Sequence, residues 1–521
     1  MAAQEEKEEK AAHVVRGTTS EANDNQVAHD VLRLAEMGYQ QEMSRKFSPL
    51  SVLALGFSLT NSWFGLSFSL ATGISSGGPV VLIYGLMITA TISLAVAISL
   101  AELASAYPNS GGQYFWAKVL APPKYAPIAS YLTGWFSFAG SIFTSASIAL
   151  GMASGIVGLY QLTHPDFVIE AWHVVVTYEL FIFFCYFLNT WGKGLPALNK
   201  ASLYMSLAAF ITILIAVPAS SPTHQSSRFV FTEFINNTGW EAQGVAFLIG
   251  LINANYPFAA LDCATHIAEE VKNPERAIPI SLLGTVAIGF TTAWTFVISM
   301  MFSIQDLDSV LNTPTLVPII EIFSQAMGTT GAIALETLII LTGVGCLATC
   351  HTWQARLCWS FSRDNGLPFS SHLSKVNQTL DVPLVAHTVG VVLNALTGLL
   401  YLGSSVAFNS LVGATIALLY ISYSIPVACQ LFRGREKTQR GPFWFGHVGF
   451  ISNIILLIWT AYSVIIYALP AVMPVEAGNM NYVCAVYVLI FLVVMLDWLL
   501  RGRKTYKGSA HEPVLDGVPM A

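Results

Sequence analysis

Two apolar stretches decide the fold of this chain, GFSLTNSWFG over residues 56–65 and GLINANYPFAALD over residues 250–262. Each lies inside a hydrophobic segment long enough to cross a membrane, yet carries polar side chains where a lipid-facing helix holds leucine or valine. Pro257 removes a backbone donor and clashes with the preceding turn, so carbonyl groups near Asn253 lose their helical partner. Unpaired backbone at this depth is tolerated only where it lines a protein-enclosed cavity or binds something. We therefore predict a binding site between two interrupted helices.

The composition of the whole chain is that of a membrane protein. Of its 521 residues, 54% are hydrophobic and only 10% are charged, whereas about a quarter of the residues in a soluble domain are charged. The hydrophobic segments are continuous, which excludes the alternating pattern of a porin-like barrel. We predict an all-α polytopic membrane protein with twelve transmembrane helices, over residues 49–73, 79–101, 127–160, 171–190, 201–218, 243–264, 279–303, 331–359, 384–402, 408–432, 447–470 and 481–500.

The basic residues give the expected orientation, because Lys and Arg concentrate in cytoplasmic loops. With both termini inside and twelve spans, all of the 24 basic residues except Arg228 fall on inner segments. The first 44 residues alternate Glu and Lys and contain few aromatic residues, a composition typical of a disordered tail. The expected parts of the chain are a cytosolic N-terminal tail, a first five-helix repeat, a second five-helix repeat, the last two helices and a cytosolic C-terminal tail, at residues 1–44, 45–218, 243–432, 441–500 and 501–521.

The two interruptions fall in the first and sixth expected spans. A proline kink satisfied by neighbouring helices is an alternative for either interruption alone. Two breaks five spans apart favour another interpretation, since transporters built from inverted repeats carry broken helices at corresponding positions of two five-helix halves. In such proteins the substrate lies between the breaks, near the middle of the membrane. We therefore predict an inverted five-plus-five helix repeat with broken first and sixth helices.

The side chains around the breaks are the candidates for substrate binding. Trp63, Tyr256 and Phe258 can offer aromatic faces to a quaternary or primary amine. The alternative for each ring is ordinary packing against neighbouring helices. Hydroxyl groups of the third span, together with carbonyl groups of the breaks, would also suit a sodium ion. The expected binding residues are Thr60, Asn61, Ser62, Trp63, Asn253, Asn255, Tyr256, Phe258, Ser141 and Ser145.

Three segments carry a family resemblance: AELASAYPNSGGQYFW over residues 101–116, ALDCATHIAEEVKNPERAIP over 260–279 and SRDNGLP over 362–368. They resemble signature segments of the amino acid–polyamine–organocation transporter superfamily, and within it the fungal amino acid/choline transporter branch. The similarity covers nearly everything between about residues 45 and 500. It implies a secondary transporter for a small amine-bearing solute, such as choline, 4-aminobutyrate, an amino acid or an alkaloid-like metabolite. It also favours coupling to protons over coupling to sodium.

Charged residues near the inner ends of the helices are candidates for gating or coupling. We expect Glu269 and Glu270 to pair with Lys272 and Arg276 across the following loop and to hold an inner gate in one state. The alternative is a surface charge cluster that contributes less than about 1 kcal/mol. The full expected set is Glu102, Asp262, Glu269, Glu270, Lys272 and Arg276.

The remaining expectations concern partners and location. The chain lacks a nucleophile–base pair or a metal-ligand set, so we expect no enzyme activity, no cofactor and no bound metal. The expected partners are the solute, protons and membrane lipid, without nucleic acid, and the oligomeric state is left open. A nutrient sensor that binds without transporting is the alternative, although its usual large cytosolic domain is missing. We expect the plasma membrane rather than the vacuole, and glycosylation at Asn236, which begins an Asn-Asn-Thr sequon on an outer loop.

Overall fold

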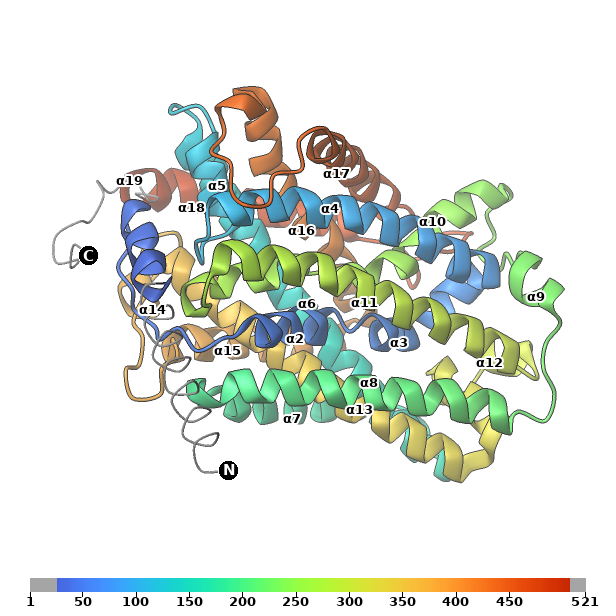
Figure 1. Ribbon diagram of the computed structural model, residues 1–521. Coiled ribbons are helices and arrows are strands. Elements are labelled where there is room, and N and C mark those ends of the chain that lie inside the picture. The colour runs from blue at the N-terminus through green and yellow to red at the C-terminus, as the bar shows by residue number, and fades with distance from the viewer. Residues whose placement is uncertain (1–25, 507–521) are drawn as a thin grey trace, which may run out of the picture.

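Eleven helical segments are long and apolar enough to cross a membrane among residues 26–506, the part of the chain that this computed structural model describes (Figure 1). The remaining span is the first, which is divided into α2 (Pro49–Thr60) and α3 (Ser62–Ser75), each too short to cross alone. Together these segments give the twelve spans that the sequence predicts. The all-α fold with a broken first helix is therefore confirmed.

The spans follow one another along the chain with short connecting helices. The connecting helices are α5 (Gln113–Leu120), α9 (Ser227–Thr232), α12 (Leu307–Leu311) and α14 (Ser370–Leu373). Spans two to twelve are η1 (Val81–Gly85) with α4 (Leu86–Ala106), α6 (Ala126–Thr163), α7 (Ala171–Asn189), α8 (Leu195–Ser220), α10 (Gln243–Asn255) with η3 (Tyr256–Phe258) and η4 (Leu261–Glu270), α11 (Pro274–Ser303), α13 (Pro318–Arg363), α15 (Leu384–Gly403), α16 (Ser405–Arg433), α17 (His447–Ile466), and α18 (Val483–Asp497) with η6 (Trp498–Gly502) and α19 (Arg503–Thr505).

A single residue interrupts the first span. Asn61 adopts the left-handed conformation, with φ 32° and ψ 62°, and its backbone N–H donates to the carbonyl of Phe57 to close the end of α2. Asparagine tolerates this conformation better than most residues with a side chain. The helix then restarts at Ser62. The polar Thr-Asn-Ser run thus marks the break itself.

The sixth span breaks over a longer stretch. α10 ends at Asn255, Pro257 lies in a single 3-10 turn, and Ala260 takes the left-handed conformation with φ 58°. Beyond this point the chain continues as a ten-residue 3-10 helix, η4, where the sequence predicts α-helix to residue 264. Such long 3-10 helices are uncommon and often mark a hinge or a strained segment. The predicted break in the sixth helix is confirmed.

Helix packing shows the symmetry of two inverted halves. Adding five to the number of a span relates α8, the fifth, to α16, the tenth, and relates α6, the third, to α13, the eighth. In agreement with this relation, α8 packs against α13 and α16 packs against α6. The second and seventh spans, α4 and α11, pack closely as well (Figure 1). The exact ends of the repeats at residues 45–218 and 243–432 stay a prediction.

The segment before the first span is ordered, which corrects one expectation. Residues 26–36 form a helix, and Leu34, Tyr39 and Met43 are buried. We call residues 26–47 the N-terminal strap. The predicted disordered tail over residues 1–44 is wrong for residues 26–44, because their few apolar side chains pack on the inner face of the bundle; residues 1–25 lie outside the described part.

The other end of the chain differs from expectation in the same way. Residues 501–505 continue the last span, and the buried Tyr506 packs its ring against Tyr131 of α6 and Phe361 of α13, at centroid distances of 5.2 and 5.8 Å. The Arg501 guanidinium pairs with Asp497 at 2.6 Å and donates to the carbonyl of Gly366 at 2.9 Å. The C-terminal tail therefore begins later than residue 501, and residues 507–521 lie outside the described part.

The topology makes a prediction for surface labelling. Glu241, between spans five and six, and Lys437, between spans ten and eleven, are both exposed and lie on opposite sides in the predicted orientation. In a background with the exposed Cys484 replaced by serine, a membrane-impermeant maleimide should label Glu241→Cys in intact cells. It should label Lys437→Cys only after permeabilisation, and the reverse pattern would show that the orientation is inverted.

Candidate functional site

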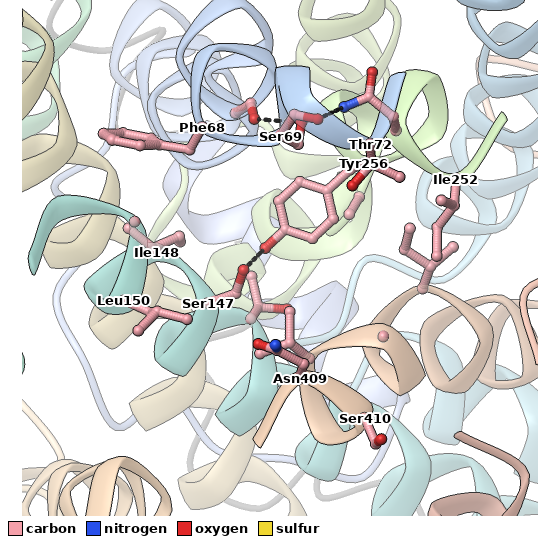
Figure 2. A pocket seen from close by; sticks show the side chains of 18 of the residues that line it. Phe68, Ser69, Thr72, Ser147, Ile148, Leu150, Ile252, Tyr256, Asn409 and Ser410 are labelled. Atoms are coloured by element: carbon pink, nitrogen blue, oxygen red, sulfur yellow. Dashed lines mark hydrogen bonds between the residues drawn. The ribbon is translucent and has the colours of Figure 1, made fainter. Parts of the chain in front are cut away.

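A cavity of about 580 Å³ lies between the two helix breaks. Thr60, Phe64 and Phe68 of the first span line it together with Tyr256 of the sixth span. Figure 2 shows Phe68 and Tyr256 among the lining side chains. Residues 478–481, in the loop between α17 and α18, line its far end. That loop is on the outer side in the predicted topology, so the cavity faces outward.

The chemistry of the lining is neutral and partly aromatic. Among the described residues that line the cavity, none is Asp, Glu, Lys, Arg or His. Its polar groups are hydroxyls and amides supplied by four spans and by the outer loop. They are Thr60, Ser69, Thr72, Thr144, Ser147, Ser154, Asn253, Tyr256, Asn409, Ser410, Tyr467, Asn479 and Asn481. A cation here would be held by ring faces, hydroxyls and carbonyls rather than by an ion pair.

Tyr256 is the central side chain of the cavity. Its hydroxyl donates to Oγ of Ser147 on α6, so the ring connects the sixth-span break to the third span (Figure 2). Phe64 and Phe68, which also line the cavity, pack edge to face with ring centroids 5.1 Å apart. Tyr467 lines the cavity as well, so four aromatic side chains contribute to its walls, of which the sequence identified one.

The other two aromatic candidates do not line the cavity. Trp63 is completely buried, and its Nε1–H donates to Oγ of Ser206 on α8 at 3.0 Å. Its ring packs against Phe210 and Phe296, with centroid separations of 6.2 and 5.6 Å. Phe258 is likewise buried and absent from the lining. Since neighbouring helical residues point about 100° apart, the cavity receives Phe64 while Trp63 points into the bundle.

Several of the predicted polar residues hold the breaks in place instead of facing the cavity. Oδ1 of Asn61 accepts from the hydroxyl of Ser206 at 2.9 Å. The Ser62 hydroxyl donates to the carbonyl of Pro257 at 2.7 Å, which joins the first break directly to the sixth. Oδ1 of Asn255 accepts from the Tyr420 hydroxyl at 3.0 Å.

Asn253 both lines the cavity and helps to hold the breaks in place. It lines the cavity, and its amide donates to the carbonyl of Ser69 at 2.6 Å. On the third span, Ser141 donates to its own helix and Ser145 accepts from Asn394, so neither lines the cavity, whereas Thr144 does. Of the ten predicted binding residues, only Thr60, Asn253 and Tyr256 line the cavity.

Sequence reasoning missed Phe64, Phe68, Thr72 and Ser147. The first three follow Thr60 at intervals of four residues, and residues four apart share one face of a helix. Extending that face from Thr60 would have found them. No sequence pattern marks Ser147 as a cavity residue, because the long third span carries many hydroxyl residues and packing sets which of them face the cavity.

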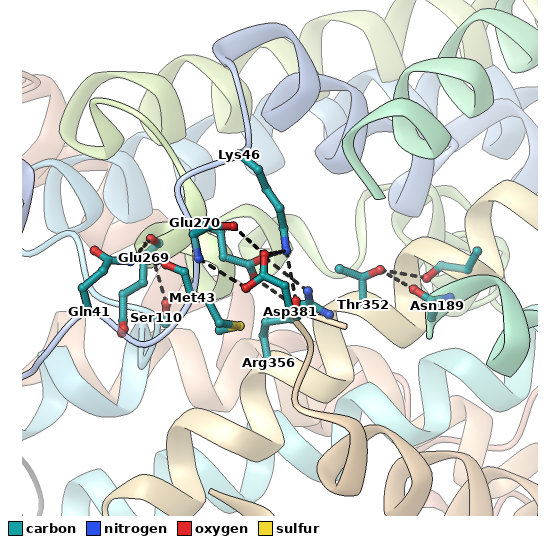
Figure 3. Close-up of polar contacts among 12 residues, drawn as sticks. Gln41, Met43, Lys46, Ser110, Asn189, Glu269, Glu270, Thr352, Arg356 and Asp381 are labelled. Carbon is teal, nitrogen blue, oxygen red and sulfur yellow. Dashed lines mark hydrogen bonds and ion pairs between the residues drawn. The ribbon is translucent and has the colours of Figure 1, made fainter. Parts of the chain in front are cut away.

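The inner side of the bundle is closed by a cluster of buried ion pairs, which we call the inner latch: Lys46, Glu269, Glu270, Arg356 and Arg363. Arg356 Nε lies 2.8 Å from Glu270 Oε1, and Lys46 Nζ lies 2.9 Å from Glu270 Oε2 (Figure 3). Arg363 binds both oxygens of Glu269, at 2.9 and 2.6 Å. The latch joins the end of η4 to the inner end of α13.

The N-terminal strap reinforces the latch. Nζ of Lys46 also lies 2.8 Å from Oδ2 of Asp381, which precedes α15. Burial opposes ionisation of that carboxyl, but hydrogen bonds from Lys46 and Ser44 outweigh it and lower the pKa of Asp381. The guanidinium of Arg363 lies over the ring of Tyr39, 4.2 Å from its centroid. The strap thus holds η4, α13 and α15 together.

The predicted partners of the two glutamates were wrong. Lys272 and Arg276 are exposed, and neither forms an ion pair within residues 26–506. The basic partners come instead from the strap and from α13, far away in the sequence. A local loop pairing would have left Arg356 buried without a counter-charge, which is far less favourable than burying a pair.

The other gating candidates also have distant partners. Glu102 lies 2.8 Å from Arg435 and accepts from the backbone N–H of Phe445 at 2.8 Å. It therefore fastens α4 to the loop before α17. Asp262 is fully buried, where it faces Tyr423 and His266.

The sequon residue Asn236 is half-buried in the outer loop. Its amide donates to the carbonyl of Trp240 at 2.8 Å, and its Oδ1 accepts from the hydroxyl of the buried Thr238. A glycan would replace one of the two N–H groups of this amide, so the remaining one would have to make the hydrogen bond to Trp240. Glycosylation of Asn236 stays a prediction.

Known proteins resemble this chain over nearly its whole length. The profile of the amino acid permease family matches residues 47–491. A choline transporter of Saccharomyces cerevisiae is 52% identical over 89% of this chain and 83% of its own length. A swainsonine transporter of Arthroderma benhamiae is 35% identical over 90% and 93%. A 7-keto 8-aminopelargonic acid transporter of Saccharomyces cerevisiae is 31% identical over 87% and 92%.

The latch makes a prediction for access from the inner side. Glu270→Gln leaves Arg356 buried without a counter-charge, a change that costs about 3 to 5 kcal/mol in buried pairs. In a variant that keeps only Cys263, which is buried in η4, this substitution should raise the rate of maleimide labelling by about tenfold or more.

The matched control is Lys272→Gln, which removes a charge from the same segment but breaks no ion pair. It should label at the parent rate. Equal labelling in Glu270→Gln and Lys272→Gln would show that the latch does not keep the inner side closed.

Proposed function

Because this chain belongs to the amino acid permease family, whose members transport small solutes across membranes, we propose that it imports choline together with protons. Support comes first from similarity: the 52% identical relative from Saccharomyces cerevisiae is a choline transporter. The swainsonine transporter is more distant, at 35%. A solute with a positively charged amine is therefore the best-supported class.

The single observation that carries the choice of choline is the uncharged, aromatic lining of the cavity. A quaternary ammonium group has no N–H to donate, so it cannot form the hydrogen bonds by which a primary amine is recognised. Aromatic faces attract it through the ring quadrupole, most strongly where water is excluded. Tyr256, Phe64 and Phe68 supply such faces within one cavity.

The broken helices add a favourable field for a cation. α2 ends at Thr60, which lines the cavity, and α10 ends at Asn255, one residue before Tyr256. The C-terminal end of a helix carries a partial negative charge. Two such ends directed at the middle of the membrane favour a bound cation over an anion, as in other transporters with discontinuous helices.

Coupling to protons is supported by carboxyl groups inside the spans. Asp262 and Glu336 are fully buried in the sixth and eighth spans, and ionisable residues at such depth commonly mark ion or proton pathways. The outward-facing cavity and the closed inner latch together suit the first step of an import cycle. Since an importer of an external solute works at the cell surface, we propose the plasma membrane as its location.

Transport by the purified protein in liposomes tests this function. Labelled choline should accumulate inside, and acidifying the outer solution relative to the lumen should increase its initial uptake severalfold. Unlabelled choline should compete, and 4-aminobutyrate should compete less well, because its carboxylate finds no charged partner in the cavity. Absence of choline uptake from protein that transports another solute would overturn the substrate assignment.

Tyr256 makes a sharper prediction about recognition. Tyr256→Leu keeps an apolar side chain but removes the ring quadrupole, a loss of about 2 kcal/mol for a desolvated cation. The KM for choline should rise by about thirtyfold. Tyr256→Phe keeps the ring and should retain most of the affinity.

The two aromatic residues that do not line the cavity serve as a contrast. Trp63→Leu removes a hydrogen bond to Ser206 and leaves a cavity in the core, so it should lower protein abundance. The Trp63→Leu protein that is still produced should transport choline with a KM close to the parent value. A thirtyfold effect of Trp63→Leu on KM, without one for Tyr256→Leu, would mean that choline binds elsewhere.

A further inference from the structure

Asp262 and His266 form a buried pair between the cavity and the inner latch. Both side chains are completely inaccessible, and they lie four residues apart on η4. Nε2 of His266 lies 3.1 Å from Oδ2 of Asp262, and Nδ1 lies 2.9 Å from the backbone carbonyl oxygen of Ser110. Both ring nitrogens therefore face oxygen atoms that accept hydrogen bonds.

This geometry requires an additional proton. A neutral imidazole carries one N–H, so only one of its two nitrogens can donate. With an ionised Asp262, the other nitrogen would place its lone pair against an oxygen lone pair at about hydrogen-bond distance, without water to separate them. One more proton, on the ring or on the carboxyl group, satisfies both contacts. The other carboxyl oxygen, Oδ1, already accepts from the hydroxyl of Tyr423 at 2.5 Å.

We propose that Asp262 and His266 together form a proton-binding site that holds the inner side of the transporter closed, so that loss of its proton is linked to opening toward the cytosol. On release, the proton passes to water and leaves a neutral imidazole facing a carboxylate. The lone pairs then repel across the contact. The closed arrangement is destabilised, and the segments that meet at the pair can separate.

The position of the pair makes that link effective. Its contacts join three parts of the inner side: η4, the loop between α4 and α5 through Ser110, and α16 through Tyr423. Glu269 and Glu270 of the latch follow His266 by three and four residues on the same helix. The Ser110 hydroxyl also accepts from the backbone N–H of Glu269 at 3.2 Å. Separation at the pair and separation at the latch therefore move the same helix.

The other titratable groups near the pair do not provide the additional proton that its two contacts require. The elements packed against η4 bring charges that are already engaged: Glu102 of α4 with Arg435, Arg356 with Glu270 and Arg363 with Glu269. Glu275 and Arg276 of α11 lie at the inner surface, and α2 has no charged residue. The neutral titratable side chains closest to Asp262 are Cys263, Cys350 and Tyr423.

Spin labels at Arg276→Cys on α11 and Lys375→Cys in the loop before α15, both exposed positions, test the proposal in otherwise cysteine-free protein. The distance distribution separates closed from open molecules without using any solute. Between about pH 5 and pH 8, the ratio of open to closed molecules should rise with pH. One linked proton permits at most about a tenfold change per pH unit.

Two substitutions remove the site in different ways. In Asp262→Asn the introduced amide can donate to a neutral ring, and in His266→Gln a neutral amide replaces the ring. Both should fold, as judged by a closed population like that of the parent at acidic pH, and both should lose the rise with pH. The matched control is His351→Gln, which replaces another fully buried histidine, one whose nitrogens contact no hydrogen-bond partner among the described residues. It should keep the pH dependence.

The proposal is overturned if the parent shows no dependence of the open fraction on pH, or if Asp262→Asn and His266→Gln keep the parent's dependence. Since the readout uses no solute, these results are independent of whether choline is the substrate. Failure of choline transport with an intact pH response would contradict only the proposed function.

Discussion

The structure depends on the requirement that backbone polar groups at membrane depth find partners. Breaking two helices in the middle of the bilayer frees several carbonyl and N–H groups, and each would cost several kcal/mol if left unpaired in hydrocarbon. Neighbouring side chains satisfy them. The Ser62 hydroxyl binds the carbonyl of Pro257, and the Thr89 hydroxyl binds that of Ala254. The two breaks are thereby held beside each other and beside the second span.

Because of this requirement, the residues of the breaks have different roles. Asn61 and Ser62 are occupied by the structural hydrogen bonds and are buried away from the cavity. The side chains proposed to recognise the solute, Phe64 and Tyr256, line the cavity instead. On the inner side, buried charges hold the same sixth span, so one continuous segment connects the latch with the cavity.

The features set by local chemistry could be predicted from the sequence. The twelve spans follow from hydrophobicity, and the breaks follow from the polar run at Asn61 and from Pro257. What the sequence could not provide were the choices among distant partners. Arg356 and Lys46 lie 86 and 224 residues from Glu270, and only the packed bundle brings them together in preference to Lys272. Which of two adjacent aromatic residues faces the cavity depends on helix rotation, which packing fixes.

The central claim is that the substrate binds between the two breaks, against the ring of Tyr256. An electron cryomicroscopy structure with choline bound would test it most directly. The account predicts density for the trimethylammonium group within about 6 Å of the Tyr256 ring centroid, in the cavity bounded by Phe64 and Phe68. Density for choline against Trp63 or Phe258, or at any position outside this cavity, would contradict it.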